Sequence, residues 1–209
     1  MTETIIKHAS KTALTLIVFA LVFTALLVYV FNLTKTPIEQ AEAKARLSLF
    51  GQIVPYNTHD NDLLKDAITI APTELLGNTQ AIIANRARMN NAPQAVILEA
   101  IAHDGYSGDI KLLIAIKYDG SIAGVRVLKH KETPGLGDYI DILKGNWIKL
   151  FDGESLIKVN NENWSVKKDG GQFDYMAGAT ITPRAVVKAV HKALQYFEAN
   201  KQSLFAESK

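Results

Sequence analysis

The 209-residue sequence contains no cysteine. The chain therefore cannot form disulfides, ligate an iron-sulfur cluster through thiolates, attach a c-type haem or use a thiol nucleophile. The formal net charge is only +2, from 23 basic and 21 acidic residues, so the composition predicts no nucleic-acid or acidic-lipid partner. The histidines lack metal-ligand spacing, and no nucleophile-elbow motif occurs. Any cofactor must be held by other side chains.

Charged residues are also absent between Lys11 and Lys35. The apolar run from Ala13 to Leu33 has 21 residues, which at about 1.5 Å per helical residue spans the roughly 30 Å hydrocarbon core of a bilayer. A secretory signal peptide is the alternative, but its apolar core has about 7 to 15 residues. We therefore predict one transmembrane helix over residues 13–33.

Basic residues before the apolar run set its expected orientation. Lys7 and Lys11 precede the run with only Glu3 to oppose them, whereas acidic residues soon follow Lys35. The positive-inside rule therefore predicts that residues 1–12 lie in the cytoplasm and that the main domain lies on the opposite side of the membrane.

A second helical pattern follows the predicted span. Thr36 and Pro37 read as an N-cap and a first helical residue. Apolar residues then recur at helical spacing up to Gly51. The pattern predicts a connecting helix within residues 34–54 and an outer domain over residues 55–209.

Three apolar or β-branched runs predict an antiparallel sheet. They cover residues 95–102, 109–118 and 121–130, and Asp119-Gly120 between the last two is a strong hairpin signal. Alternate residues from Ile110 to Tyr118 share one apolar face, and the other face is partly apolar. We expect helices over part of both faces. Residues 55–94 are turn-rich and carry no clear strand pattern.

Two further helices are predicted. One covers Asp138 to Phe151. The other begins with Thr182 as N-cap and Pro183 as first residue, and apolar residues follow at helical spacing. We therefore expect an α+β outer domain, an antiparallel sheet flanked by helices, after the single transmembrane helix.

Three short segments could bind a ligand. In "HKETPGLGD", residues 130–138, glycines on both sides of Leu136 should make that apolar side chain project from a tight loop. In "WSVKKDGGQFD", residues 164–174, lysines precede two glycines and could meet an anion. In "AGAT", residues 177–180, the Thr180 hydroxyl stands close to a helix start, where amides and the macrodipole favour a phosphate.

Each segment also has a plain structural interpretation. The first can be an ordinary strand-to-helix turn with Asp138 as a helix cap. The second can be a solvated turn. The third can be a threonine that bonds nearby backbone.

Taken in order after one membrane span, "GYSGDIKLLIAI", "HKETPGLGD", "WSVKKDGG" and "DYMAGATIT" resemble the FMN-binding domain of the G subunit of the Rnf (Rsx) electron-transport complex. The resemblance covers essentially the whole chain. The related C subunit of the sodium-pumping NADH:quinone reductase shares the fold and the attachment motif, but it is typically longer, and it is the alternative.

The resemblance implies covalent FMN. In that family a flavin transferase recognises Asp-x-x-(Ser/Thr)-Gly-Ala-Thr and joins the FMN phosphate to the threonine hydroxyl. The motif corresponds here to residues 174–180, with Asp174, Gly178 and Ala179 matching and Thr180 as the attachment point; Ala177 stands where the family has serine or threonine. The same resemblance implies further cofactor-binding residues, namely Glu132, Thr133, Pro134, Gly135, Leu136 and Gly137 near the ring, and Lys168 and Thr182 near the phosphate.

The resemblance also implies a function and a location. The chain would pass electrons through FMN beside other membrane subunits of a complex that couples electron transfer to ion translocation, in the bacterial inner membrane with the main domain on the periplasmic side. Two other classes remain: a non-redox membrane-anchored binding module, and a threonine-dependent hydrolase, for which the sequence offers no base at a persuasive position.

Overall fold

The computed structural model describes residues 2–206, so Met1 of the predicted N-terminal segment and residues 207–209 of the predicted outer domain lie outside the described residues. The chain divides into two compact units, Met1–Arg46 and Leu47–Lys209. The second unit thus begins inside the predicted connecting segment, because Leu47, Phe50 and Ile53 pack into the core of that unit.

The first unit is formed by α1, which runs without interruption over Thr2–Ile53 and continues into the second unit. Its side chains from residue 13 to residue 33 are exposed, and the helix is long and apolar enough to cross a membrane. The prediction of a separate helix starting at Thr36 is wrong, because Pro37 lies inside α1. Proline has no backbone N–H, so it removes one intrahelical hydrogen bond at that point of α1.

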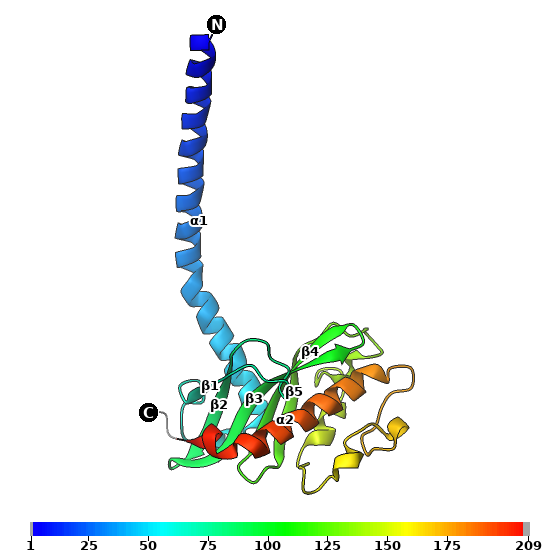
Figure 1. The fold of residues 1–209 in the computed structure, drawn as a ribbon. Helices are drawn as coiled ribbons and strands as arrows, with labels where there is room; N and C mark the ends of the chain where they lie inside the picture. Colours follow the sequence, from blue (N-terminus) through cyan, green and yellow to red (C-terminus); the bar gives the residue numbers. More distant parts are fainter. Residues whose placement is uncertain (1, 207–209) are drawn as a thin grey trace. The chain divides into compact units, whose positions relative to one another are not determined.

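The second unit contains five strands, one long helix and several 3-10 turns (Figure 1). The strands follow in sheet order as an antiparallel meander, as predicted, and the Asp119-Gly120 hairpin is confirmed, with Gly120 at φ +90°. The elements are β1 (Ala67–Ile70), β2 (Ile82–Met89), β3 (Ala92–Gly105), β4 (Gly108–Lys117), β5 (Ile122–Lys129) and α2 (Ile181–Phe205), with the 3-10 turns η1 (Tyr56–Thr58), η2 (Asp138–Ile140), η3 (Trp147–Phe151), η4 (Asn161–Asn163) and η5 (Lys167–Asp169).

Strands β1 and β2 lie within residues 55–94, where the sequence carries no clear strand pattern. Strand β2 carries Arg86 and Arg88, which are 3% and 8% exposed, so it lacks an apolar alternation. Both guanidinium groups bind the Asp66 carboxylate, at 2.5 Å and 2.8 Å. Buried charges are tolerated when they are paired in this way, and the pairing becomes visible only in three dimensions.

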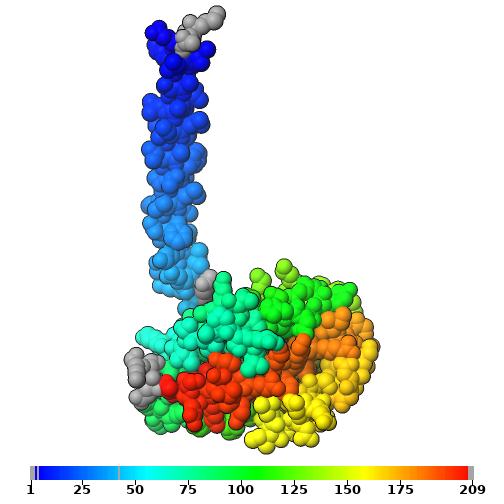
Figure 2. Space-filling model, viewed as in Figure 1, coloured from blue at the N-terminus to red at the C-terminus, as the bar shows by residue number. Residues whose placement is uncertain are grey.

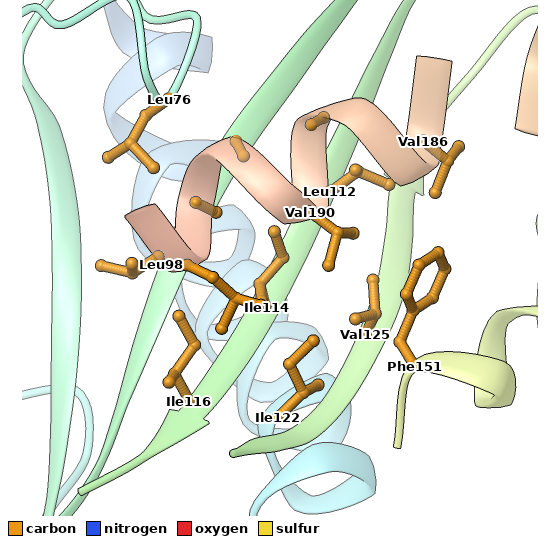
Figure 3. Close-up of a cluster of buried hydrophobic side chains, with 14 of the residues drawn as sticks. Leu76, Leu98, Leu112, Ile114, Ile116, Ile122, Val125, Phe151, Val186 and Val190 are labelled. Atoms are coloured by element: carbon orange, nitrogen blue, oxygen red, sulfur yellow. The ribbon is translucent and has the colours of Figure 1, made fainter. Parts of the chain in front are cut away.

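Helix α2 covers one face of the sheet. Figure 3 shows Val186 and Val190 of α2 in the same buried cluster as Leu112 and Ile114 of β4. All four side chains are at most 1% exposed. Each buried aliphatic side chain of this size contributes about 1.5 to 3 kcal/mol, so this contact is the main apolar core of the unit.

The opposite face of the sheet is covered by the end of α1. Phe50 and Ile53 are at most 1% exposed and pack against Leu113 of β4. Gly124 of β5 permits this approach, because a Cβ at that position would lie 2.8 Å from the Ile53 side chain. Helical cover on both faces, as the sequence predicted, is thereby confirmed.

The predicted helix over residues 138–151 is wrong. The segment forms η2 and η3, separated at Asp141, whose backbone is extended at ψ 132°. The Asp141 carboxylate accepts a hydrogen bond from the Leu143 N–H at 2.9 Å. Such local bonds from aspartate compete with helix formation and favour turns.

Candidate functional site

A cavity of about 230 Å³ lies between the loop after β5 and the beginning of α2. Four stretches of chain line it: the β3–β4 hairpin, the loop after β5, the segment before α2 and the first turn of α2. In Figure 2 the yellow surface comes from the chain between β5 and α2, and it lies beside the orange-to-red surface of α2. The lining residues are Tyr106, Glu132, Thr133, Leu136, Gly137, Gly178, Ala179, Thr180, Ile181 and Thr182.

The loop over residues 133–137 closes as a tight turn. The Thr133 carbonyl accepts hydrogen bonds from the N–H groups of Leu136 and Gly137, at 3.1 and 3.0 Å. Gly135 has φ +75° and donates its N–H to the Asp138 carboxylate at 2.8 Å. Leu136 is left 46% exposed beside the cavity. The prediction that Leu136 projects from the loop is therefore confirmed.

A buried carboxylate joins this loop to its neighbours. Glu132 is 4% exposed. One carboxylate oxygen accepts the Ser107 N–H of the β3–β4 hairpin at 2.9 Å, and the other accepts the Thr182 hydroxyl of α2. Gly137 packs so closely on this pair that a Cβ there would lie 2.8 Å from Thr182 Oγ1. The Glu132 carboxylate thus connects three elements around the cavity.

Helix α2 begins two residues earlier than predicted. Its first residue is Ile181 and its N-cap is Thr180, whose side chain makes no capping hydrogen bond. Thr182 is therefore not the N-cap, because its side chain is buried within the helix and its hydroxyl is donated to Glu132. Pro183 is tolerated at the third position, since N–H groups in the first turn have no intrahelical acceptor.

The segment before α2 is held by two aromatic side chains. The Trp147 indole donates to the Asp174 carbonyl at 2.6 Å, and the Met176 N–H donates to the Tyr139 hydroxyl at 3.3 Å. Burial raises the pKa of Tyr139 above its usual value. Gly178 then has φ +87°, a conformation that glycine adopts without strain. These contacts bring Thr180 to the edge of the cavity.

Lys168 and Asp174 do not line the cavity. Asp174 is exposed and forms an ion pair with Lys167 at 2.6 Å. Lys168 lies in η5, beside Asp169, whose carboxylate binds the Arg184 guanidinium of α2 at 2.5 Å. The hydrogen bond from Arg184 holds the pKa of Asp169 below its usual value. The Lys-Lys-Asp-Gly-Gly turn is thus docked on α2 rather than on the cavity.

The structure brings together most residues that the sequence analysis singled out. Eight of them line the cavity, namely Glu132, Thr133, Leu136, Gly137, Gly178, Ala179, Thr180 and Thr182. Pro134 and Gly135 shape the loop without lining the cavity. Sequence reasoning missed Tyr106 and Ile181, which also line it and are 66% and 45% exposed. Two features of the sequence could have indicated them. Tyr106 is an aromatic residue between the glycines of a hairpin, and Ile181 is an apolar residue outside the buried stripe of α2.

The arrangement suits a flat ligand that carries a phosphate. Leu136, Tyr106 and Ile181 offer exposed apolar surface to a ring. The unpaired N–H groups at the start of α2 and the macrodipole favour an anion next to the Thr180 hydroxyl. Among residues 2–206, no cluster of histidine, aspartate or glutamate is arranged to hold a metal ion.

Two protein-family models match this chain. One, described as the RnfG N-terminal region, matches residues 1–53, and the other, described as the FMN-binding domain, matches residues 105–195. The second range contains every residue that lines the cavity.

Curated relatives match over nearly the full length. The G subunit of the ion-translocating oxidoreductase complex of Vibrio atlanticus is 47% identical over 197 residues, which cover 94% of each chain. The protein of the same name from Vibrio cholerae serotype O1 is 45% identical over 194 residues, 93% of this chain and 92% of that protein. A crystal structure of Shewanella oneidensis NqrC is similar with a TM-score of 0.47 and 22% identity, covering 71% of this chain and 76% of that one.

Proposed function

This chain belongs to the family of G subunits of ion-translocating oxidoreductase complexes, and we propose that it carries electrons on an FMN whose phosphate is esterified to Thr180. It is an FMN-binding subunit of a multi-subunit oxidoreductase. The ester, the residues around it and the placement of the domain across the membrane are our proposals.

The observation that carries the proposal is the position of Thr180. It is the N-cap of α2, lines the cavity and makes no side-chain capping bond. In the proposed ester Thr180 Oγ1 bonds to the flavin phosphorus while the Oγ1–H bond and one P–O bond break. The proton leaves with the displaced oxygen group, so that the product, counted from FMN and threonine, has lost one water. The remaining phosphate oxygens would then lie beside the free N–H groups of the first turn of α2, which stabilise negative charge.

The cavity fits part of an FMN. Its volume of about 230 Å³ is below the roughly 300 to 1,000 Å³ of enclosed small-molecule sites. One part of the cofactor would be held inside and the rest would lie against the surface. A covalent bond to the chain would keep FMN in such an open site, because it prevents the cofactor from dissociating even though the cavity does not enclose it.

The flavin supplies the redox chemistry, and the chain sets its position and surroundings. We propose that Leu136 and Thr133 contact the ring, with Pro134 and Gly135 fixing their loop. Glu132 would orient the loop and α2, since it lies next to the loop and binds the Thr182 hydroxyl of the helix. Lys168 remains our candidate for longer-range attraction of the phosphate from outside the cavity, and Asp174 for recognition by the flavin transferase.

The same proposal includes the membrane arrangement. We propose that residues 13–33 of α1 cross the bacterial inner membrane, that residues 1–12 lie in the cytoplasm and that the domain from residue 55 onward faces the periplasm. The apolar, exposed surface of α1 supports a single-pass anchor. A reporter enzyme fused after Lys209 tests the orientation, and reporter activity on the cytoplasmic side would contradict it.

The attachment is tested by co-expression of the full chain with a flavin transferase. A denaturing gel under blue light should show a fluorescent band for the wild type and for Thr180→Ser, and none for Thr180→Val. Thr182→Val, which removes the neighbouring hydroxyl, should stay fluorescent. Intact mass should rise by one FMN less one water. A fluorescent Thr180→Val band would overturn the site.

A further inference from the structure

A second cavity lies next to the first and has a different chemistry. Its volume is also about 230 Å³, and it is lined by Ser107, Gly108, Asp109, Lys111, Lys129 and Lys131. These residues come from the β3–β4 hairpin, the start of β4, the last residue of β5 and the loop that follows it. None of them was a candidate in the sequence analysis, because the three lysines are not adjacent in the sequence.

The three lysines of this cavity have no acidic partner in the described part of the chain, residues 2–206. Within residues 2–206, none of their ammonium groups forms an ion pair or a side-chain hydrogen bond, and all three side chains are exposed. The carboxylate that lies among them, Asp109, is bound by His103 Nδ1 at 2.9 Å. The cavity therefore carries an uncompensated positive charge.

The register of β4 and β5 places two of these positive charges opposite each other, which lowers the stability of the fold. Lys111 of β4 and Lys129 of β5 are directly paired across the two strands. Like charges in such a cross-strand pair are destabilising. An unpaired basic cluster that opposes folding in the isolated chain is stabilised when an anionic surface covers it.

One hydrogen bond joins a residue that lines the lysine cavity to a residue that lines the cavity beside Thr180. Ser107 donates its N–H to Glu132 at 2.9 Å. Ser107 lines the lysine cavity and its neighbour Tyr106 lines the other one; Lys131 and Glu132 are divided in the same way. The basic surface is thus immediately next to the proposed flavin.

We propose that Lys111, Lys129 and Lys131 form the docking surface for an acidic segment of another protein subunit, the one with which the flavin exchanges electrons. The inference rests on the proposed function. Electron transfer requires the partner to approach the ring closely, and redox contacts of small area depend on complementary charge for orientation and specificity. Tyr106, which is next to Ser107 in the chain and 66% exposed, supplies an apolar part of such a contact.

The first test measures retention of this subunit in the complex. The triple variant Lys111→Gln/Lys129→Gln/Lys131→Gln is co-expressed with flavin transferase and the other subunits, and the complex is isolated in detergent through a tag on another subunit. Washes of rising salt should release the variant at about one tenth of the salt concentration that releases the wild type, since exposed charge contacts are screened by salt. Equal release would overturn the proposal.

The matched control is Lys144→Gln, which removes an exposed lysine that has no ion pair among residues 2–206. It should be retained like the wild type, and a loss equal to that of the triple variant would contradict a local docking surface. In-gel flavin fluorescence is read on all samples. It should be unchanged in the triple variant, so a failure of docking is distinguished from a failure of flavin attachment.

The second test identifies what contacts the lysines. A photo-crosslinking amino acid replaces Lys131 in the assembled complex, and position 144 serves as control. Adducts at an acidic segment of another subunit are expected, and reversing those acidic residues to lysine should restore retention of a Lys111→Glu/Lys129→Glu/Lys131→Glu variant. Crosslinks to lipid, or a retention difference seen only in bilayers with anionic lipid, would assign the surface to the membrane instead.

Discussion

The floor of the cavity beside Thr180, formed by Glu132, Gly137 and Thr182, is buried, whereas its rim at Leu136 and Gly178 is exposed to solvent. Every polar group of the Glu132–Thr182 pair has a partner within the chain. Thr180, between the two, makes no capping bond. The floor is therefore part of the folded core, and the rim is available for a ligand.

This contrast explains how the site can form before a flavin is attached. The buried Glu132 carboxylate accepts two hydrogen bonds and so fixes the loop, the hairpin and α2 relative to one another. These bonds form when the chain folds and do not depend on the flavin. The rim residues are exposed to solvent, so they can contact a cofactor without losing contacts of the folded core. Substitutions in the floor should mainly lower stability, and substitutions in the rim should mainly change flavin attachment or contact.

The largest effect is expected for Glu132→Ala. It removes the acceptor of both the Ser107 N–H and the Thr182 hydroxyl and leaves two donors without their partner. Unsatisfied buried donors cost roughly 1 to 3 kcal/mol each, so the free energy of unfolding should fall by about 3 kcal/mol. Denaturation of the flavin-free chain, followed by tryptophan fluorescence, measures it. Glu132→Gln should cost clearly less, and equal losses would contradict a hydrogen-bonding role.

Gly137→Ala should be the next most destabilising change. The added methyl group would meet Thr182 Oγ1 at 2.8 Å and the Glu132 side chain at 3.0 Å. Overpacking of this kind costs about 2 kcal/mol. The double variant Gly137→Ala/Thr182→Ala is the informative comparison in the same denaturation experiment. If removing the Thr182 side chain's outer atoms relieves none of the loss, the close contact is not its cause.

Thr182→Val should lower the free energy of unfolding by about 1.5 kcal/mol, because it replaces the hydroxyl that binds the Glu132 carboxylate by a methyl group of similar size. The flavin band on a denaturing gel should remain. Thr182→Ser, which keeps the hydroxyl, provides the control. A stability as low for serine as for valine would show that packing, rather than the hydrogen bond, dominates.

A comparison of alanine substitutions at two glycines with positive φ distinguishes backbone strain from an effect on flavin attachment. Gly135 and Gly178 have φ of +75° and +87°, and a Cβ at either meets no atom within 4 Å. Replacement of either glycine by alanine should therefore cost a similar amount, about 1 kcal/mol. Only Gly178→Ala, within the proposed attachment motif, should weaken the fluorescent band. Equal bands for both variants would remove Gly178 from the recognised motif.

The smallest effect on stability is expected for Leu136→Ala. The side chain is 46% exposed, so its loss should change the free energy of unfolding by no more than about 0.5 kcal/mol. If Leu136 contacts the flavin ring, the absorption and fluorescence of the bound flavin in the folded chain should change. An unaltered flavin spectrum together with a large loss of stability would place Leu136 in the floor instead.

The sequence predicted the central part of the fold correctly because its signals there are local. The apolar run from Ala13 to Leu33, the alternation through β4 and the Asp119-Gly120 turn each depend on neighbours a few residues away. The prediction failed for the helix over residues 138–151, where the Asp141 side chain competes with the helix for backbone N–H groups. It also missed β2, whose buried arginines are compensated by Asp66, 20 and 22 residues earlier in the chain.

At the site, short stretches of sequence are enough to predict a tight glycine loop, a small-residue segment and a threonine near a helix start. How these parts meet depends on the tertiary structure. It joins Glu132 to Thr182, 50 positions apart, and places the N-cap at Thr180. It also brings Tyr106 of the β3–β4 hairpin to the cavity. These contacts are buried or hydrogen-bonded between segments that are far apart in the chain. Such contacts leave no local periodic pattern in the sequence from which they could be predicted.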